Sequence, residues 1–112
     1  FVLVASEPFP LIATNFYQIL VTSDLTAWVV NILTGPHNDL VGPVAGHFNL
    51  DAVWSFSSSD LSAQIEAASA GNLKRTWVNN RQACDWFAPA SEGRHFLAAA
   101  TEVKTIWVPY GE

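Results

Sequence analysis

The sequence predicts one α+β domain, a sandwich in which a mostly antiparallel sheet of about five strands carries two or three helices. Runs rich in β-branched and aromatic residues come first and are joined by short turns, as in hairpins. Segments of helical composition come late in the chain. A length of 112 residues fits a single globular domain over residues 1–112, and half of these residues are apolar, enough to build a core.

The strands are expected where β-branched and aromatic side chains gather. These places are residues 1–5, 16–22, 26–33, 52–57 and 103–108, with a further strand indicated at 76–78. Residues 16–22 and 26–33 have the pattern of a hairpin turning at Asp24. Both of its faces are apolar, which predicts a central place in the sheet. Residues 34–46 are interrupted by glycine and proline, so a long loop is expected there.

The clearest helix is expected at residues 60–70. Ser59 suits the N-cap, and Asp60 suits the positive end of the helix dipole. Leu61, Ile65 and Ala68 recur at the spacing of one helix face. Residues 91–100 also have helical composition, and a strand stays open as the alternative there.

The charge pattern excludes two classes of partner. The net charge is −5, and the five Lys and Arg residues form no basic stripe, so neither nucleic acid nor an anionic membrane surface is an expected ligand. No apolar run approaches the roughly 20 residues that span a bilayer, so membrane insertion is not expected. The chain begins at Phe1 and contains no Met, which indicates a processed N-terminus and a secreted protein. The single Cys84 is expected to be buried.

Familiar enzyme motifs are absent from the sequence. It contains no Gly-x-Ser-x-Gly elbow, Gly-rich phosphate loop or His-Glu-x-x-His motif. His37 with Asp39, and His47 with Asp51, are spaced for metal ligation or acid–base work, but such short pairs more often cap turns. We therefore expect no catalytic site, metal or cofactor. A small hydrolase using His37 and Asp39 stays open as an alternative, as does a protein-binding defence module such as a protease inhibitor, which would use residues 35–46 as its loop.

Tryptophan is the unusual feature of the composition. Trp28, Trp54 and Trp107 lie in apolar runs and are expected in the core. Sugars present flat apolar faces ringed by hydroxyls, so they bind to aromatic rings beside planar polar side chains. Residues 76–86 combine these groups in one segment, which makes them the first candidate site: Trp77, Asn79, Asn80, Arg81, Asp85 and Trp86. The second candidate is the loop that holds His37, Asn38 and Asp39.

The overall profile resembles the small secreted glycan-binding proteins of mushrooms. The resemblance rests on chain length, acidic charge and tryptophan content, and residues 76–86 are the segment that looks like a sugar site. It implies a non-catalytic, metal-free, lectin-like defence protein that binds glycans or glycoproteins. It also implies a sheet that can extend through a dimer. A homodimer is expected independently, because the terminal strands at 1–5 and 103–108 have few features that would block edge pairing.

Overall fold

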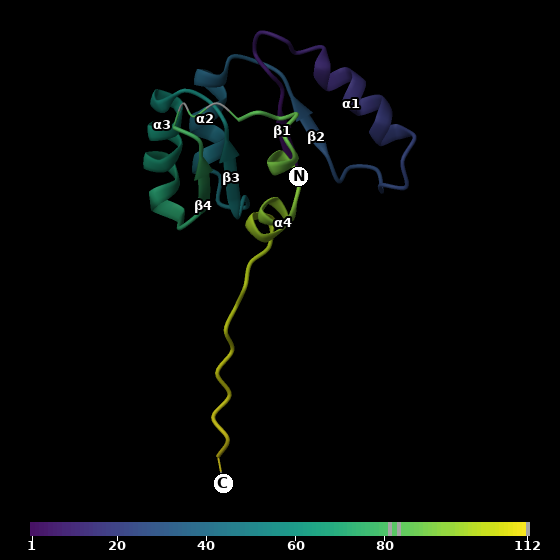
Figure 1. Ribbon diagram of the computed structural model, residues 1–112. Helices are drawn as coiled ribbons and strands as arrows, with labels where there is room; N and C mark the ends of the chain where they lie inside the picture. Colours follow the sequence, from purple (N-terminus) through teal and green to yellow (C-terminus); the bar gives the residue numbers. More distant parts are fainter. Residues whose placement is uncertain (81, 83, 112) are drawn as a thin grey trace.

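Strands and helices alternate from the N-terminus to β4, two further helical elements follow, and the chain ends in an extended segment, as the computed structural model in Figure 1 shows for residues 1–80, 82 and 84–111. In order, the elements are β1 (Val2–Val4), α1 (Ile12–Val21), β2 (Asn31–Leu33), α2 (His37–Gly46), β3 (Ala52–Ser55), α3 (Ser59–Ser69), η1 (Ala70–Asn72), β4 (Arg75–Val78), η2 (Pro89–Ser91) and α4 (Arg94–Ala100).

The strands form two parallel pairs among the described residues. β1 pairs with β2, Leu3 lying opposite Ile32, and β3 pairs with β4, Trp54 lying opposite Trp77. A helix joins the members of each pair, α1 in the first and α3 in the second, because parallel strands need a long crossover connection. The predicted sandwich with a mostly antiparallel sheet of about five strands is therefore wrong, although the chain does combine helices with strands.

The predicted central hairpin does not form. Residues 16–21 belong to α1, which begins shortly after Pro10, and within 26–33 only β2 is extended. Buried Ala13 and half-buried Leu20 are seven residues apart, so they face the same side of a helix. The hydroxyls of Thr14 and Thr22 donate to backbone carbonyls one turn earlier. The β-branched residues of this segment favoured a strand. Packing of one side of the helix against the domain outweighs that preference.

The predicted loop at 34–46 is also wrong beyond its first three residues. α2 begins directly after Pro36 and contains Pro43. Its more buried residues are Leu40, Val41, Val44 and Ala45, at helical spacing, whereas Gly42 and Gly46 are exposed. α2 packs against α3 through this apolar side. The glycine residues therefore lie where a side chain is not needed for packing.

Five other predicted elements are found close to their expected places. β1 lies within 1–5, β3 lies within 52–57, β4 covers 76–78, α3 covers 60–69, and α4 lies within 91–100 as a helix. The N-cap of α3 is Ser58 rather than Ser59, since Ser58 Oγ accepts a bond of 3.3 Å from the backbone N–H of Leu61.

The core is small for so apolar a chain. The buried apolar residues are Ala5, Ala13, Ala45 and Ile65, and α3 lies over β4 as well as against α2. Trp28 is 91% exposed, which contradicts its expected core position, and Trp54 is 37% exposed. Most large apolar side chains of α1 and the loop after it lie at the surface.

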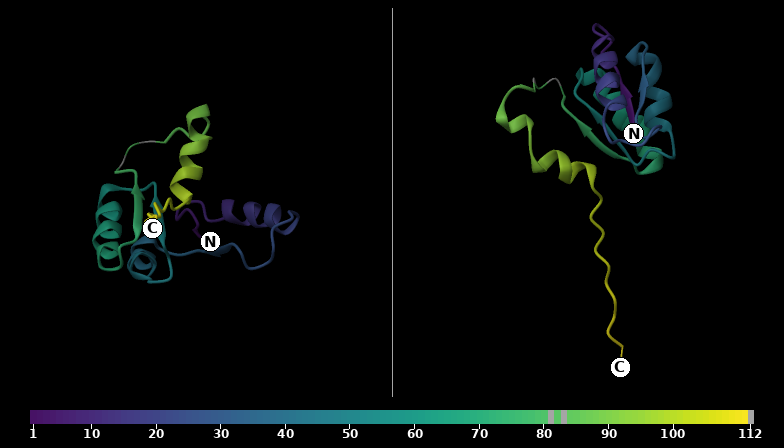
Figure 2. Two further views of the ribbon diagram at one scale, coloured as in Figure 1. Left: turned by 90° about the horizontal axis from the view of Figure 1, so that it is seen from below. Right: turned by 90° about the vertical axis from the view of Figure 1, so that its right-hand side faces the viewer.

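The C-terminal segment stands apart from the rest of the structure. After α4 the chain runs away from the helices and strands as a single extended segment, which Figures 1 and 2 show from three directions. The strand predicted at 103–108 therefore does not form, because no other segment lies beside it to pair with. Trp107 is 89% exposed, so its predicted core position is wrong.

Candidate functional site

A groove of about 430 Å³ lies at the carboxyl ends of β1 and β2. Carboxyl ends of neighbouring parallel strands meet at one edge, so two segments about thirty residues apart form its walls. One wall follows β1, and the other is the turn from β2 into α2. The residues that line it are Ser6, Glu7, Pro10, Leu11, Thr14, Thr34, Gly35 and Pro36.

Two hydrogen bonds tie the end of β1 to the start of α2 at this groove. The backbone N–H of His37 donates to Glu7 Oε2 at 3.2 Å, and His37 Nε2 donates to the buried carbonyl of Ala5 at 2.8 Å. The Glu7 carboxylate therefore lies at the positive end of the α2 dipole, where a negative charge is stabilised. Gly35 lets the turn form, because its φ of 153° is one that other residues rarely adopt.

The second predicted site, His37 to Asp39, is the first turn of α2 rather than a loop. His37 is half-buried and bonded to Ala5, whereas Asn38 and Asp39 are exposed. The structure therefore uses His37 to hold the groove together. The inhibitor loop expected over residues 35–46 is likewise replaced by this helix.

An aromatic cluster occupies the first predicted site. Trp77 lies at its centre, 5.1 Å from Trp54 and 5.2 Å from Phe96 of α4 between ring centroids. Phe56 contacts both Trp77 and Trp86 edge to face, at 5.5 and 5.0 Å. Neighbouring rings thus cover much of the Trp77 ring, which agrees with a structural role.

The other predicted residues of 76–86 that the structure describes are Trp86, Asp85, Asn79 and Asn80. Trp86 is 53% exposed, and beside it the exposed Asp85 accepts a bond of 3.1 Å from the backbone N–H of Phe87. The side-chain amide of Asn79 donates to the carbonyl of Gln82, which closes the turn. Asn80 is exposed with a φ of 45°. Arg81 lies outside the described residues.

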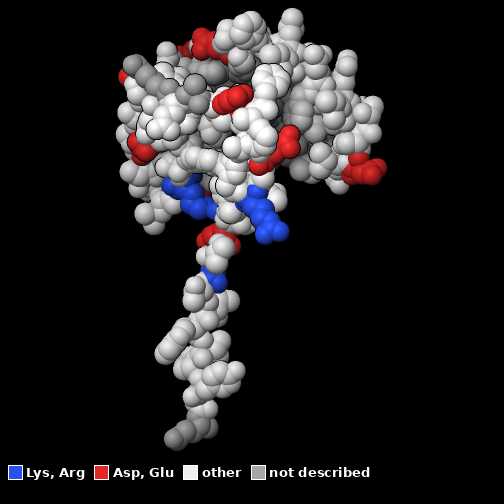
Figure 3. Space-filling view, viewed as in Figure 1, with Lys and Arg blue, Asp and Glu red and all other residues white. Residues whose placement is uncertain are grey.

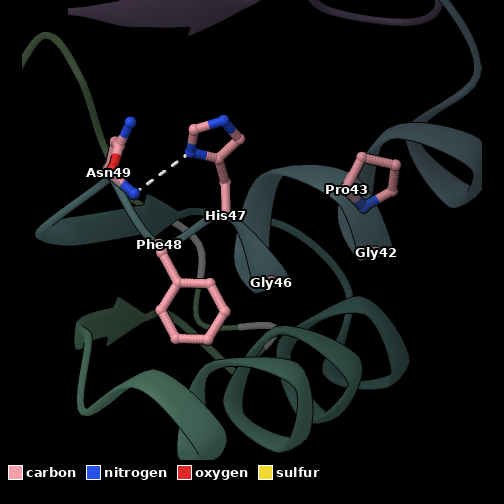
Figure 4. Close-up of a pocket in the computed structure, with 6 residues that line it drawn as sticks. All are labelled: Gly42, Pro43, Gly46, His47, Phe48 and Asn49. Carbon is pink, nitrogen blue, oxygen red and sulfur yellow. Dashed lines mark hydrogen bonds between the residues drawn. The ribbon is translucent and has the colours of Figure 1, made fainter.

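A second pocket, of about 560 Å³, lies at the end of α2 (Figure 4). His47 and Phe48 point to opposite sides of the chain there, and the backbone N–H of Asn49 donates to His47 Nδ1 at 3.2 Å. No carboxylate lines this pocket, and glycine and proline form much of its wall. It offers a ligand fewer directional partners than the groove does.

Charge is spread thinly over the surface. Figure 3 shows acidic side chains scattered over the visible face, with the basic ones gathered near the root of the C-terminal segment. Within the described part of the chain, no group of three or more His, Cys, Asp and Glu residues is placed to hold a metal ion. No helix among those same residues is long and apolar enough to span a membrane. Cys84 is half-buried, with its Sγ 3.7 Å from Ser91 Oγ.

Comparison with known proteins identifies no family for this chain, so a function has to be inferred from the sites described above. No protein-family model matches the chain, and no solved structure matches it.

Sequence reasoning missed the groove because it expected an antiparallel sheet. Ser6 and Glu7 lie just beyond the strand expected at 1–5 and were given no part in a site, and Thr34 was placed at the start of a loop. The available signal was the position of these polar residues directly after two apolar strands. In a parallel sheet such positions converge at the ligand-binding edge.

Proposed function

We propose that this protein binds a small ligand that carries a sugar, such as a nucleoside or a glycoside, in the groove at the carboxyl ends of β1 and β2. The proposal keeps the carbohydrate chemistry expected from the sequence and moves it to a different place. Ligands of open parallel α/β sheets bind outside the carboxyl ends of the strands. The observation that carries the proposal is the placement of the Glu7 carboxylate at that edge.

Glu7 has the chemistry that a pair of neighbouring sugar hydroxyls requires. One carboxylate oxygen, Oε2, is held by the N–H of His37, which orients the group. The other, Oε1, has no hydrogen bond to any described residue and is available to accept from a ligand hydroxyl. Bonds to a charged acceptor are stronger than bonds between neutral groups. The hydroxyls of Ser6 and Thr34 lie in the same groove and add further donors and acceptors.

The apolar part of the groove suits a flat ring or the apolar face of a sugar. Pro10, Leu11 and Pro36 line it together with the polar residues. Two of these are prolines with little conformational entropy to lose on binding. A ligand that combines a flat face with vicinal hydroxyls would use both kinds of surface.

The negative charge of Glu7 favours a neutral part of the ligand beside it. A helix start ordinarily attracts phosphate through its free N–H groups. Here the N–H of His37 is already bonded to Glu7, whose negative charge would also repel an anion. The sugar, rather than any phosphate attached to it, is therefore the part we place beside Glu7.

Ligand-observed NMR tests this proposal with adenosine and methyl glycosides as probes. Saturation transfer to at least one probe is expected, and Glu7→Gln should weaken its binding about tenfold or more, because a hydrogen bond to a charged group contributes about 1.5–3 kcal/mol. The matched control is Glu66→Gln, an exposed carboxylate on α3. If neither probe binds, or if the Glu7 variant binds as wild type does, the proposal fails. A nucleoside that lacks one hydroxyl of the pair, 2′-deoxyadenosine, should bind more weakly than adenosine.

A second candidate is glycan binding at Trp86, as the sequence predicted. The specific observation in its favour is a half-exposed ring that contacts Phe56 at 5.0 Å and Phe96 at 6.3 Å and keeps about half of its surface open, with the exposed Asp85 next to it in the chain. A glycan would stack on the exposed part of the Trp86 ring, and one of its hydroxyls would donate to Asp85. A secreted, non-catalytic role in defence, as the resemblance to mushroom proteins implies, stays a prediction.

A further inference from the structure

The tail, residues 102–110, exposes almost every large apolar side chain that it carries. No hydrogen bond or ring contact joins residues 103–110 to the other described parts of the chain, and its ion pair, Lys104 with Glu102 at 3.5 Å, lies within the tail. Apolar surface of this extent marks an interaction site more often than a solvated segment. The exposed fractions are 89% for Val103, 81% for Ile106, 89% for Trp107, 69% for Val108 and 104% for Tyr110.

The root of the tail is fixed so that the tail points away from its own domain. Arg75 Nη1 donates to the carbonyl of Thr101 at 2.7 Å, at the start of β4. Figures 1 and 2 show the chain leaving the domain from there. Between Thr101 and Val108 there is no Gly, Pro, Asn or Asp to make a turn, and the β-branched residues favour an extended backbone. The sequence thus opposes a return of the tail onto its own domain.

The same chain carries an unpartnered apolar stripe on α1. Ile12, Phe16 and Ile19 recur at i, i+4 and i+7, which places them along one side of the helix. Their exposed fractions are 64%, 37% and 63%. The helix turns Ala13 and Leu20 toward the domain instead. The α1 stripe therefore has the pattern of a packed helix face without a described residue that covers it.

We propose that the tail of one copy packs on the α1 stripe of a second copy, and that the exchange is reciprocal. Alternation along an extended chain puts Ile106 and Val108 on one side, about 7 Å apart. The stripe runs about 10 Å from Ile12 to Ile19. The two apolar side chains of the tail thus fit within the length of the stripe. A contact that each copy both gives and receives closes a two-fold dimer and leaves neither surface free.

The area is close to what a stable dimer needs. Tyr110, which follows Ile106 and Val108 on the same side of the extended tail, can bury about 150–250 Å². With Ile106, Val108 and the matching surface of α1 counted in both reciprocal contacts, the dimer approaches the lower end of the range of about 1,200–2,000 Å² typical of specific interfaces. This inference specifies the contact of the homodimer expected from the sequence, and it does not depend on the sugar ligand.

Sedimentation velocity on the full chain over a range of concentrations tests the proposal. The wild type should be a dimer at tens of micromolar. Ile106→Asp, in a tail that packs on nothing in its own copy, should raise the dimer dissociation constant at least about tenfold without altering the fold. Ile19→Asp on the stripe should do the same, whereas Gln18→Asp, an exposed neighbour outside the stripe, should leave the dimer intact.

Mixing the two defective variants separates exchange between copies from folding back within one. The Ile106→Asp copy keeps a sound stripe, and the Ile19→Asp copy keeps a sound tail, so their mixture keeps one of the two contacts and should associate measurably more tightly than either variant does alone. A monomeric wild type, a dimer that survives Ile106→Asp, or a mixture that associates no more tightly than the separate variants would overturn the proposal.

Discussion

Glu7 and His37 are thirty residues apart in sequence and are joined by a bond of 3.2 Å from the backbone N–H of His37 to Oε2 of Glu7. The bond connects the end of the first strand to the start of the second helix. The His37 ring strengthens the connection by donating to Ala5. The walls of the groove are therefore fixed by contacts between segments that sequence reasoning treated separately.

Removing the His37 ring should destabilise this connection. His37→Leu leaves the buried carbonyl of Ala5 without its donor, and an unsatisfied buried polar group costs about 1–3 kcal/mol. We expect a loss of that size in the free energy of unfolding, measured by urea denaturation. The control is Asn38→Ala on the exposed side of the same turn. Equal stability of the two variants would show that the His37 ring bond contributes nothing.

The two tryptophans of the first predicted site should behave differently. Trp77→Ala removes the ring that contacts Trp54, Phe56 and Phe96 and should cost about 3 kcal/mol of stability. Trp86→Ala should cost only about 1 kcal/mol, since its ring is half-exposed. Thermal unfolding of both variants measures the difference.

Binding on the same samples tests the second candidate function. If glycans stack on Trp86, Trp86→Ala should weaken binding about ten- to hundredfold while the fold survives, because one aromatic platform contributes about 1–3 kcal/mol. Asn80→Ala should have a smaller effect, of about 0.5–1.5 kcal/mol. Unchanged glycan affinity in the Trp86 variant would remove this site from consideration.

The stability of the protein should rise with pH in the alkaline range because of Lys74. Burial lowers the pKa of this lysine below 10.5, and the nearby Asp51 carboxylate opposes the shift by raising it. Its side chain is 8% exposed and donates to the carbonyl of His47. Between the lowered pKa and 10.5 the unfolded chain binds more protons than the folded one, so raising the pH stabilises the fold.

Urea unfolding at a series of pH values, compared between variants, isolates this contribution. Lys74→Met should lose the alkaline rise in stability that the wild type shows. Lys104→Met should keep it, because that side chain is 73% exposed. A wild-type slope no steeper than that of Lys74→Met would contradict the prediction.

Local patterns predicted some elements well because their determinants lie within a few residues. Ser58 and Asp60 begin α3, and the spacing of Leu61 and Ile65 defines its inner side. For α2 the helical spacing was present at Leu40 and Val44, but glycine and proline were weighted more heavily. Packing of α2 against α3 favours the helix in spite of these residues. A pattern read over a few neighbouring residues does not include the partner helix.

Strand direction could not be predicted, and the location of the site depended on it. A short apolar run has the same composition whether its neighbour is parallel or antiparallel. Once α1 was interpreted as a strand, β1 and β2 had no crossover helix between them, and parallel pairing was excluded. Glu7 and Thr34 then had no reason to lie together. The misassigned α1 thus accounts for the missed groove. It does not account for the second parallel pair, β3 with β4, whose crossover helix α3 was predicted.

Alanine substitutions at two glycines should have opposite effects on stability. Gly35 lies in the turn that shapes the groove, and Gly42 lies in the helix that follows it. Gly35 has a φ of 153°, and a Cβ there would meet Leu40 Cδ1 at 3.6 Å, which is an ordinary contact. The cost of Gly35→Ala therefore comes from the backbone and should be about 1–2 kcal/mol. Gly42 lies inside α2 with nothing within 4 Å of an added Cβ. Gly42→Ala should therefore stabilise the fold by about 0.5–1 kcal/mol, since alanine has the higher helix propensity.

Chemical denaturation of the two alanine variants measures both effects against one wild type. The comparison is informative because the same atom is added at each position and only the backbone conformation differs. If Gly35→Ala stabilises the protein as Gly42→Ala does, the turn after β2 does not need its left-handed residue, and the wall of the groove that contains Thr34 and Pro36 is not fixed in the way described. If Gly35→Ala alone is destabilising and also weakens the binding of adenosine or a methyl glycoside, the geometry of this turn links stability to the proposed site.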